Sequence, residues 1–251
     1  MVKHYIIMSS SYTDGTRVAL DITEASLLNS ESISKIIQSI QKRCGKDVPL
    51  SSHLIETKSD TWASVAEYDP FFENVVCTKS AEDFSSKIKK SRVLSGIDVA
   101  RYILTKIKCT HLSVQKLVYF SYADYLCTRS KRLFEDQIYA FRHGPIVESV
   151  YKTYKGSGYQ YLNELELDTD RDVQTEVTEL PARSRILFAE DGVEKLQSIN
   201  QTIEKYGRYS ARELVEITHR SGSPWSHTDS SKIYQIITDE VIMAHHRAER
   251  P

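Results

Sequence analysis

The sequence predicts an α+β protein in which a predominantly α-helical C-terminal domain follows a small α/β N-terminal domain. Short strand-like runs alternate with single helical patterns in the first part of the chain, whereas apolar residues recur at helical spacing almost continuously from about Ser95 onward. A basic, polar connector at residues 87–92 separates the two patterns. A chain of 251 residues is long enough for two domains, and we expect them at residues 1–91 and 95–251.

The N-terminal region carries a turn signal, Asp14-Gly15, between two runs of strand-forming residues, which predicts a hairpin. Isoleucines at helical spacing precede Gly45, a residue typical of helix C-termini, and predict an amphipathic helix. In chain order we expect strands at residues 4–9 and 17–21, a helix around 33–40, strands at 53–56, 64–68 and 75–78, and a helix over 80–90.

The C-terminal region shows helical periodicity with marked starts and stops. Ser210 and Glu213 form a capping-box pattern, Gly207 ends the preceding pattern, and Pro145 suits the first turn of a helix. We expect helices over residues 97–107, from Ser113 as N-cap to about 129, over 146–154, 193–206 and 210–217, and a last helix over 233–246 with a possible break at Thr238; residues 138–141 are expected to be extended and 155–180 to be a polar connection.

Composition excludes several classes of function. Lys and Arg total 33 against 34 Asp and Glu, a net charge of -1, so we expect no nucleic-acid partner for the chain as a whole. No apolar stretch approaches the ~18 residues of a membrane span, and we expect a cytoplasmic protein without membrane contact. The four cysteines are scattered without a C-x-x-C pair, which predicts reduced thiols.

Four blocks occur in a fixed order in the C-terminal region. The first is the run 99–104, and the second, residues 114–120, is similar to a Lys-Leu-Gln-Lys-Leu-Leu-Tyr motif with Ser113 in place of the first lysine. The third joins residues 133–134 to 140–147 and 150–151, and is similar to an Ala-Trp-x-x-Gly-Pro-Val segment with Phe141 in place of the tryptophan. The fourth comprises Leu214, Thr218-His219 and Pro224-Trp225.

Together these blocks resemble the Panacea antitoxin domain, also called the SocA-like antitoxin domain, over about residues 95–246. The resemblance implies an antitoxin: a mostly helical domain that binds and neutralises a cognate protein toxin, usually encoded by the adjacent gene, and needs no cofactor. At least one relative is also a proteolytic adaptor that delivers its toxin to a Clp protease. Residues 1–91 lie outside the resemblance, and their role is not implied by it.

Residues of these blocks are the candidates for toxin binding. Arg142 and His143 precede a helix start at Gly144-Pro145, where side chains of a turn reach solvent; Arg beside aromatic residues is typical of interface hot spots. Each candidate also has a plain structural reading, as a solvated pair, a helix start or a loop aromatic that covers the core. The full set is Lys116, Tyr119, Arg142, His143, Gly144, Pro145, Tyr151, His219 and Trp225.

Two other functions stay open on the sequence. One is a proteolytic adaptor or phage-associated interaction protein, in which binding leads to delivery of the partner to a protease rather than to inhibition. The other is a metal-dependent hydrolase built on His219, His227, His245 and His246, although their spacing matches no standard zinc pattern. No local signature pairs a nucleophile with a base, so we expect no enzymatic activity and no metal.

Overall fold

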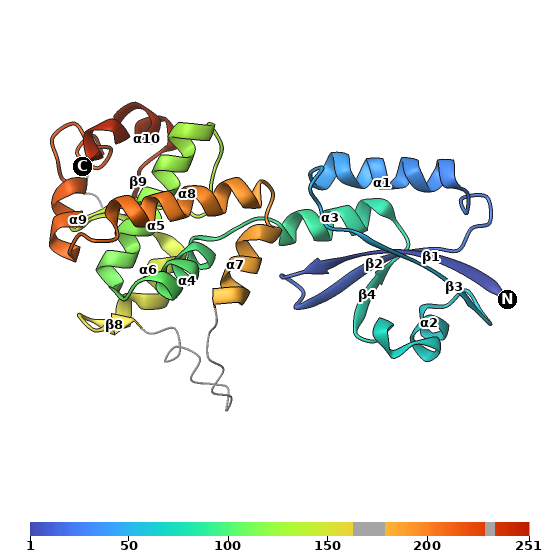
Figure 1. The fold of residues 1–251 in the computed structure, drawn as a ribbon. Helices are drawn as coiled ribbons and strands as arrows, with labels where there is room; N and C mark the ends of the chain where they lie inside the picture. Colours follow the sequence, from blue (N-terminus) through green and yellow to red (C-terminus); the bar gives the residue numbers. More distant parts are fainter. Residues whose placement is uncertain (163–178, 229–233, 251) are drawn as a thin grey trace. The chain divides into compact units, whose positions relative to one another are not determined.

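The computed structural model describes residues 1–162, 179–228 and 234–250, and it confirms the α+β fold class (Figure 1). The described chain divides into two compact units. The N-terminal unit comprises Met1–Val93 together with Phe188–Glu190, and the C-terminal unit comprises Leu94–Leu187 and Asp191–Pro251. Each unit has its own architecture.

The N-terminal unit is built on a four-stranded sheet in the order β3-β1-β2-β4. The predicted hairpin is confirmed, since β1 pairs antiparallel with β2; β4 is parallel to β2. The elements of this unit are β1 (Val2–Ser11), β2 (Thr16–Ile22), α1 (Ser30–Cys44), β3 (Ser51–Thr57), α2 (Trp62–Tyr68), the 3-10 helix η1 (Pro70–Phe72), β4 (Val75–Thr78) and α3 (Ala81–Ser91).

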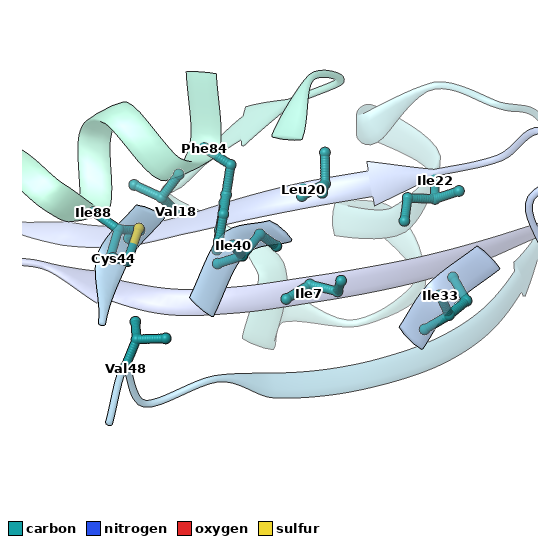
Figure 2. Packing of buried hydrophobic residues seen from close by; sticks show 10 residues of the cluster. All are labelled: Ile7, Val18, Leu20, Ile22, Ile33, Ile40, Cys44, Val48, Phe84 and Ile88. Carbon is teal, nitrogen blue, oxygen red and sulfur yellow. The ribbon is translucent and has the colours of Figure 1, made fainter. Parts of the chain in front are cut away.

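Apolar residues are buried on both faces of this sheet. Helices α1 and α3 cover one face, and Figure 2 shows Ile40 of α1 and Phe84 of α3 packed with Ile7 of β1. Helix α2 and η1 cover the other face, where Val65 and Phe72 pack on the neighbouring β1 residues. Because successive strand residues point to opposite faces, β1 is apolar on both sides.

The strand expected at residues 64–68 is wrong, because this segment is part of helix α2. Trp62 and Val65, three residues apart, both pack on the sheet, which is the spacing of a helix face. Five residues of mixed pattern are too few to distinguish the period of a helix from that of a strand.

The C-terminal unit is arranged around one central helix, α5, which lies among the other helices in Figure 1. Helices α4, α6, α8, α9 and α10 and strand β7 all contact it. The elements are α4 (Gly96–Lys106), β5 (Cys109–Thr110), α5 (His111–Arg129), β6 (Ile138–Phe141), β7 (Gly144–Val147), α6 (Glu148–Tyr154), η2 (Lys155–Ser157), β8 (Tyr161–Leu162), α7 (Glu179–Phe188), α8 (Gly192–Tyr206), α9 (Ala211–Thr218), β9 (Gln235–Ile236), α10 (Asp239–His245) and the 3-10 helix η4 (His246–Glu249).

Local signals placed several of these helices correctly. Ser210 and Glu213 form the capping box that begins α9, and α8 ends before Gly207 as expected. Helix α5 begins earlier than predicted: Thr110 is its N-cap, and its hydroxyl accepts a hydrogen bond from the backbone N–H of Ser113 (3.3 Å). Ser113 therefore lies in the first turn rather than at the cap.

Three further expectations need correction. Pro145 is not in the first turn of a helix but in strand β7, and α6 begins at Glu148. Helix α10 begins after Thr238, its N-cap; residues 229–233, which include the expected start of the last helix, lie outside the described part of the chain. Helix α7 was not predicted and begins at the end of the expected polar connection, of which residues 163–178 lie outside the described ranges. Within the described ranges, every helix is too short or too polar to cross a bilayer.

Candidate functional site: a hairpin turn anchored to the helical core

The third sequence block forms a β-hairpin rather than a helix start. Strands β6 and β7 pair antiparallel, with Phe141 opposite Gly144, so that Arg142 and His143 form a two-residue turn. The left-handed backbone conformation falls on Gly144 (φ 92°) and not on the turn residues, an arrangement typical of a turn followed by a G1 bulge. Glycine is thus favoured at this position by the backbone alone.

Side chains of α5 bind the outer edge of β7. Gln115 donates from Nε2 to the carbonyl oxygen of Val147 (3.0 Å) and accepts from the Val147 N–H (3.3 Å). The Lys116 ammonium donates to the carbonyl oxygen of Pro145 (2.7 Å), and Pro145 itself has no N–H to satisfy. The edge of the hairpin is therefore paired with a helix in place of another strand.

The space beneath Gly144 is fully occupied. A Cβ atom at this position would lie 2.5 Å from Oγ1 of Thr218 and 2.9 Å from Nζ of Lys116. Thr218, the last residue of α9, is itself buried. Backbone conformation and crowding thus independently require glycine at residue 144.

Two further carbonyl groups of the turn are bound by residues after α9. Trp225 donates from Nε1 to the carbonyl oxygen of Phe141 (2.8 Å), and Nε2 of His219 lies 3.1 Å from that of Arg142. The rings of His219 and Trp225 pack on each other with centroids 3.8 Å apart. Blocks two, three and four of the sequence, separated along the chain, therefore meet at one turn.

Beneath the turn lies a buried polar network that links α5 to η4. Tyr119 donates to Oε2 of Glu249 (2.9 Å), and Nδ1 of His246 lies 2.7 Å from the same oxygen. Nε2 of His246 lies 2.9 Å from Oδ1 of Asp124. Tyr119, Glu249 and His246 are all at most 1% exposed, so these groups depend on one another for hydrogen bonds.

The pKa values in this network follow from burial and pairing. Burial raises the pKa of Glu249 above its usual range. Burial opposes protonation of His246, but its hydrogen bonds with Asp124 and Glu249 outweigh this and raise its pKa. The pKa of Lys116 falls to about 7 because the ammonium is fully buried, and the negative charge of Glu249 only partly counteracts this.

The opposite side of the hairpin faces solvent. Arg142 and His143 are exposed, and no described residue forms an ion pair with either. Phe141 contacts Tyr151 of α6 and Tyr234, with ring centroids 5.4 and 5.5 Å apart. The turn thus presents two ionisable side chains next to aromatic rings, from a backbone that the core holds in place.

The structure divides the predicted site residues into an inner and an outer set. Lys116 and Tyr119 do not project outward: both are fully buried, because Pro145 and Glu249 provide their polar partners inside the core. Gly144 and Pro145 are also buried, whereas Arg142 and His143 are exposed. Tyr151, His219 and Trp225 are partly exposed. Direct toxin contact stays a prediction for the outer set, and the buried residues support the turn.

Sequence reasoning missed Glu249 and His246 as parts of this site, as well as Tyr139 and Tyr234 on its outer side. No motif signals them, because their partners lie far along the chain. The four histidines considered for metal binding do not converge: His219 packs on Trp225, His227 stacks on His245 with centroids 3.6 Å apart, and His246 lies in the buried network. Among the described residues, no group of three or more metal-ligating side chains is present.

Fold and site together define a helical domain that holds an exposed hairpin turn on a buried polar network. Residues 114–226 match the family model described as "Antitoxin SocA-like, Panacea domain", which confirms the resemblance.

The matched segment begins in α5 and ends just after Trp225, and it contains three of the four blocks. Antitoxin SocA of Caulobacter vibrioides (strain NA1000 / CB15N) is 27% identical to the chain over 135 residues, which cover 54% of this chain and 68% of that protein. No solved structure matches.

Proposed function

We propose that this protein is an antitoxin that binds a cognate protein toxin, encoded by the adjacent gene, and neutralises it by direct contact. We further propose that residues 1–91 and 95–251 are separate domains and that the second carries the binding surface. The protein acts in the cytoplasm and in stoichiometric amounts, because it blocks its partner by occupying a surface and not by catalysis.

The observation that carries this proposal is the convergence of the family's sequence blocks on the β6–β7 turn. Side chains of Lys116, His219 and Trp225 bind three carbonyl groups within five residues of chain. A turn fixed in this way loses little conformational entropy when a partner binds, which favours affinity. The match to an antitoxin family supports the proposal that the exposed side of this turn binds a toxin.

The experiment is induction of the adjacent open reading frame in a heterologous host, with and without this protein. Growth should stop when the neighbour is expressed alone and resume on co-expression. The matched control is a copy of this gene with an early stop codon, which keeps the transcript and removes the protein. A neighbour that is harmless alone, or that stays toxic while this protein is soluble, contradicts the proposal.

The same cultures separate inhibition from degradation. Direct neutralisation predicts that the toxin accumulates to equal or higher levels on co-expression and co-purifies with this protein at a fixed ratio. A fall in toxin level that depends on a host Clp protease would instead indicate an adaptor, and immunoblotting in a protease-deficient host distinguishes these results.

A further inference from the structure

Four aromatic rings form a continuous surface on the outer side of the β6–β7 hairpin. Tyr139 and Phe141 alternate along β6 and share a face; Tyr234 contacts both, with centroids 5.6 and 5.5 Å away, and Tyr151 contacts Phe141. Tyr234 is 61% exposed. We call these four residues the aromatic patch.

The backbone at Tyr234 is unusual for an exposed aromatic residue. Its φ of 61° is in the left-handed region, which costs a residue with a side chain about 1–2 kcal/mol. The neighbouring Ile236, in the short edge strand β9, is also 40% exposed. Tyr234 and Ile236 therefore lie at the surface of the C-terminal unit and not in its core. Backbone strain at such a position is typical of binding sites.

Positive charge surrounds the patch on the side of the turn and α6. Arg142 has no ion-pair partner among the described residues, and the Lys155 ammonium lies 6.0 Å from the centre of the Tyr151 ring. Lys152 is paired with Glu148 at 2.6 Å, and the phenols of Tyr139 and Tyr234 are close enough to affect its protonation. Among the described residues, three cations thus face one carboxylate at this end of the patch.

The opposite end of the patch has different electrostatics. Ile236 borders a cavity of about 310 Å³ that is also lined by Asp239 and Glu240. Asp239 is neutralised by Arg132 at 2.7 Å and accepts a hydrogen bond from Tyr122. Within the described part of this surface, the excess of positive charge therefore lies at the turn and at the end of α6.

We propose that the aromatic patch, together with Arg142, Lys152 and Lys155, is the surface that docks the toxin, and that the toxin presents an apolar side chain flanked by Asp or Glu residues. This inference rests on the proposed function and gives it a location and a partner chemistry. The rings provide a desolvated centre, and the cations provide a rim that attracts acidic groups, an arrangement typical of interface hot spots.

The test uses the full-length protein and the product of the adjacent open reading frame, with affinities measured by calorimetry. Arg142→Glu and Tyr234→Ala should each weaken binding about tenfold or more, as loss of a hot spot does. Arg208→Glu is the control for the charge, because Arg208 is also exposed and lies near a tyrosine ring, that of Tyr209. Tyr68→Ala, at 66% exposure in the N-terminal unit, is the control for the ring.

The outcomes separate this inference from the proposed function. The docking surface is supported if the wild-type protein binds the toxin, Arg142→Glu and Tyr234→Ala weaken this binding, and the two control variants do not. Unchanged binding by both variants overturns it while the antitoxin function stands. If the wild-type protein neither binds the toxin nor rescues growth, the proposed function is overturned, and this inference with it. Thermal unfolding of each variant shows whether a loss of binding reflects a loss of fold.

A suppressor selection tests the predicted partner chemistry. Toxin mutants that Arg142→Glu neutralises again, and that still kill cells without antitoxin, should replace Asp or Glu by a neutral or basic residue at one site. Binding of wild-type protein should also weaken as salt concentration rises, because exposed charges are screened. Suppressors without any change of an acidic residue would contradict an acidic partner surface.

Discussion

Each unit of the molecule contains one fully buried histidine whose two ring nitrogens are both bonded, and the two differ in what they connect. In the N-terminal unit, Nδ1 of His4 lies 3.0 Å from Asp21 and Nε2 lies 3.0 Å from Thr57. In the C-terminal unit, the ring of His246 lies between Glu249 and Asp124. His4 is thus bound by one carboxylate and one hydroxyl group, whereas His246 is bound by two carboxylates.

The network around His4 joins neighbouring strands and ends at solvent. His4, Asp21 and Thr57 belong to β1, β2 and β3, and Asp21 also binds the half-exposed Lys79 (2.6 Å). Its groups hold the sheet together. The network around His246 continues through Glu249 to Lys116, whose pKa depends on it, and Lys116 binds the turn. We infer that the first network serves stability alone, and that the second also determines the conformation of an exposed loop.

Replacement of Glu249 by leucine should have the largest effect. It removes the buried carboxylate that pairs with Nδ1 of His246 and offsets the charge of Lys116, and leaves His246 with Asp124 alone. Breaking a buried pair costs about 3–5 kcal/mol in the free energy of unfolding. Hydrogen exchange should accelerate over residues 138–147 as well as around η4. The matched variant Asp21→Leu should accelerate exchange in β1 and β3 and leave residues 138–147 unchanged. If residues 138–147 exchange at the same rate in the Glu249 variant and in the wild type, the network around His246 does not determine the conformation of the hairpin and, like that around His4, serves stability alone.

Gly144→Ala should lower the free energy of unfolding by about 2–4 kcal/mol, through the positive φ and the crowding by Thr218 and Lys116. Gly15→Ala is the control, because Gly15 also has a positive φ (65°) but no atom lies within 4 Å of its Cβ position. That change should cost only about 1–2 kcal/mol. Urea titration measures both. Equal costs would show that the space beneath the turn readily accommodates a methyl group.

Features that depend on neighbouring residues could be predicted from the sequence, whereas features that depend on distant contacts could not. The N-terminal hairpin, the end of α1 at Gly45 and the capping box of α9 follow from signals a few residues apart, and they were predicted. The hairpin at Pro145 was not, since proline suits both a first helical turn and an edge strand. The burial of Lys116 depends on Glu249, more than a hundred residues away in sequence, and no local pattern carries that information.

The low pKa of Lys116 predicts a specific pH dependence. The folded protein releases this proton near pH 7, whereas the unfolded chain keeps it to about 10.5. The unfolded state therefore binds more protons between these values, and the free energy of unfolding rises with pH. Relative to Lys116→Met, the wild type should gain about 2 kcal/mol from pH 7.5 to 9.0. Lys155→Met, at an exposed position, is the control and should run parallel to the wild type.

If that difference between wild type and Lys116→Met stays constant over this range, the ammonium is solvated and the turn is not held from a dry core. The stability cost of burying Lys116 would then be absent. A difference that is constant to pH 9.0 and falls only above about pH 10.5 would mean that pairing with Glu249 outweighs burial and raises the pKa of Lys116 above its usual value.

The smallest predicted effect separates the hydrogen bond of Trp225 from its packing. Trp225→Phe removes the hydrogen bond to Phe141 and keeps a ring beside His219. Loss of the bond should lower the free energy of unfolding by about 0.5–1.5 kcal/mol, and the smaller ring should lower it further because it buries less area. Trp62→Phe in the N-terminal unit is matched, since Trp62 is also half-buried and packs on an aromatic ring, that of Phe72. The difference between the free energies of unfolding lost in Trp225→Phe and in Trp62→Phe measures the contribution of the hydrogen bond to Phe141. Equal losses would show that Trp225 stabilises the turn by packing alone, and that Lys116 and His219 provide the hydrogen bonds that fix it.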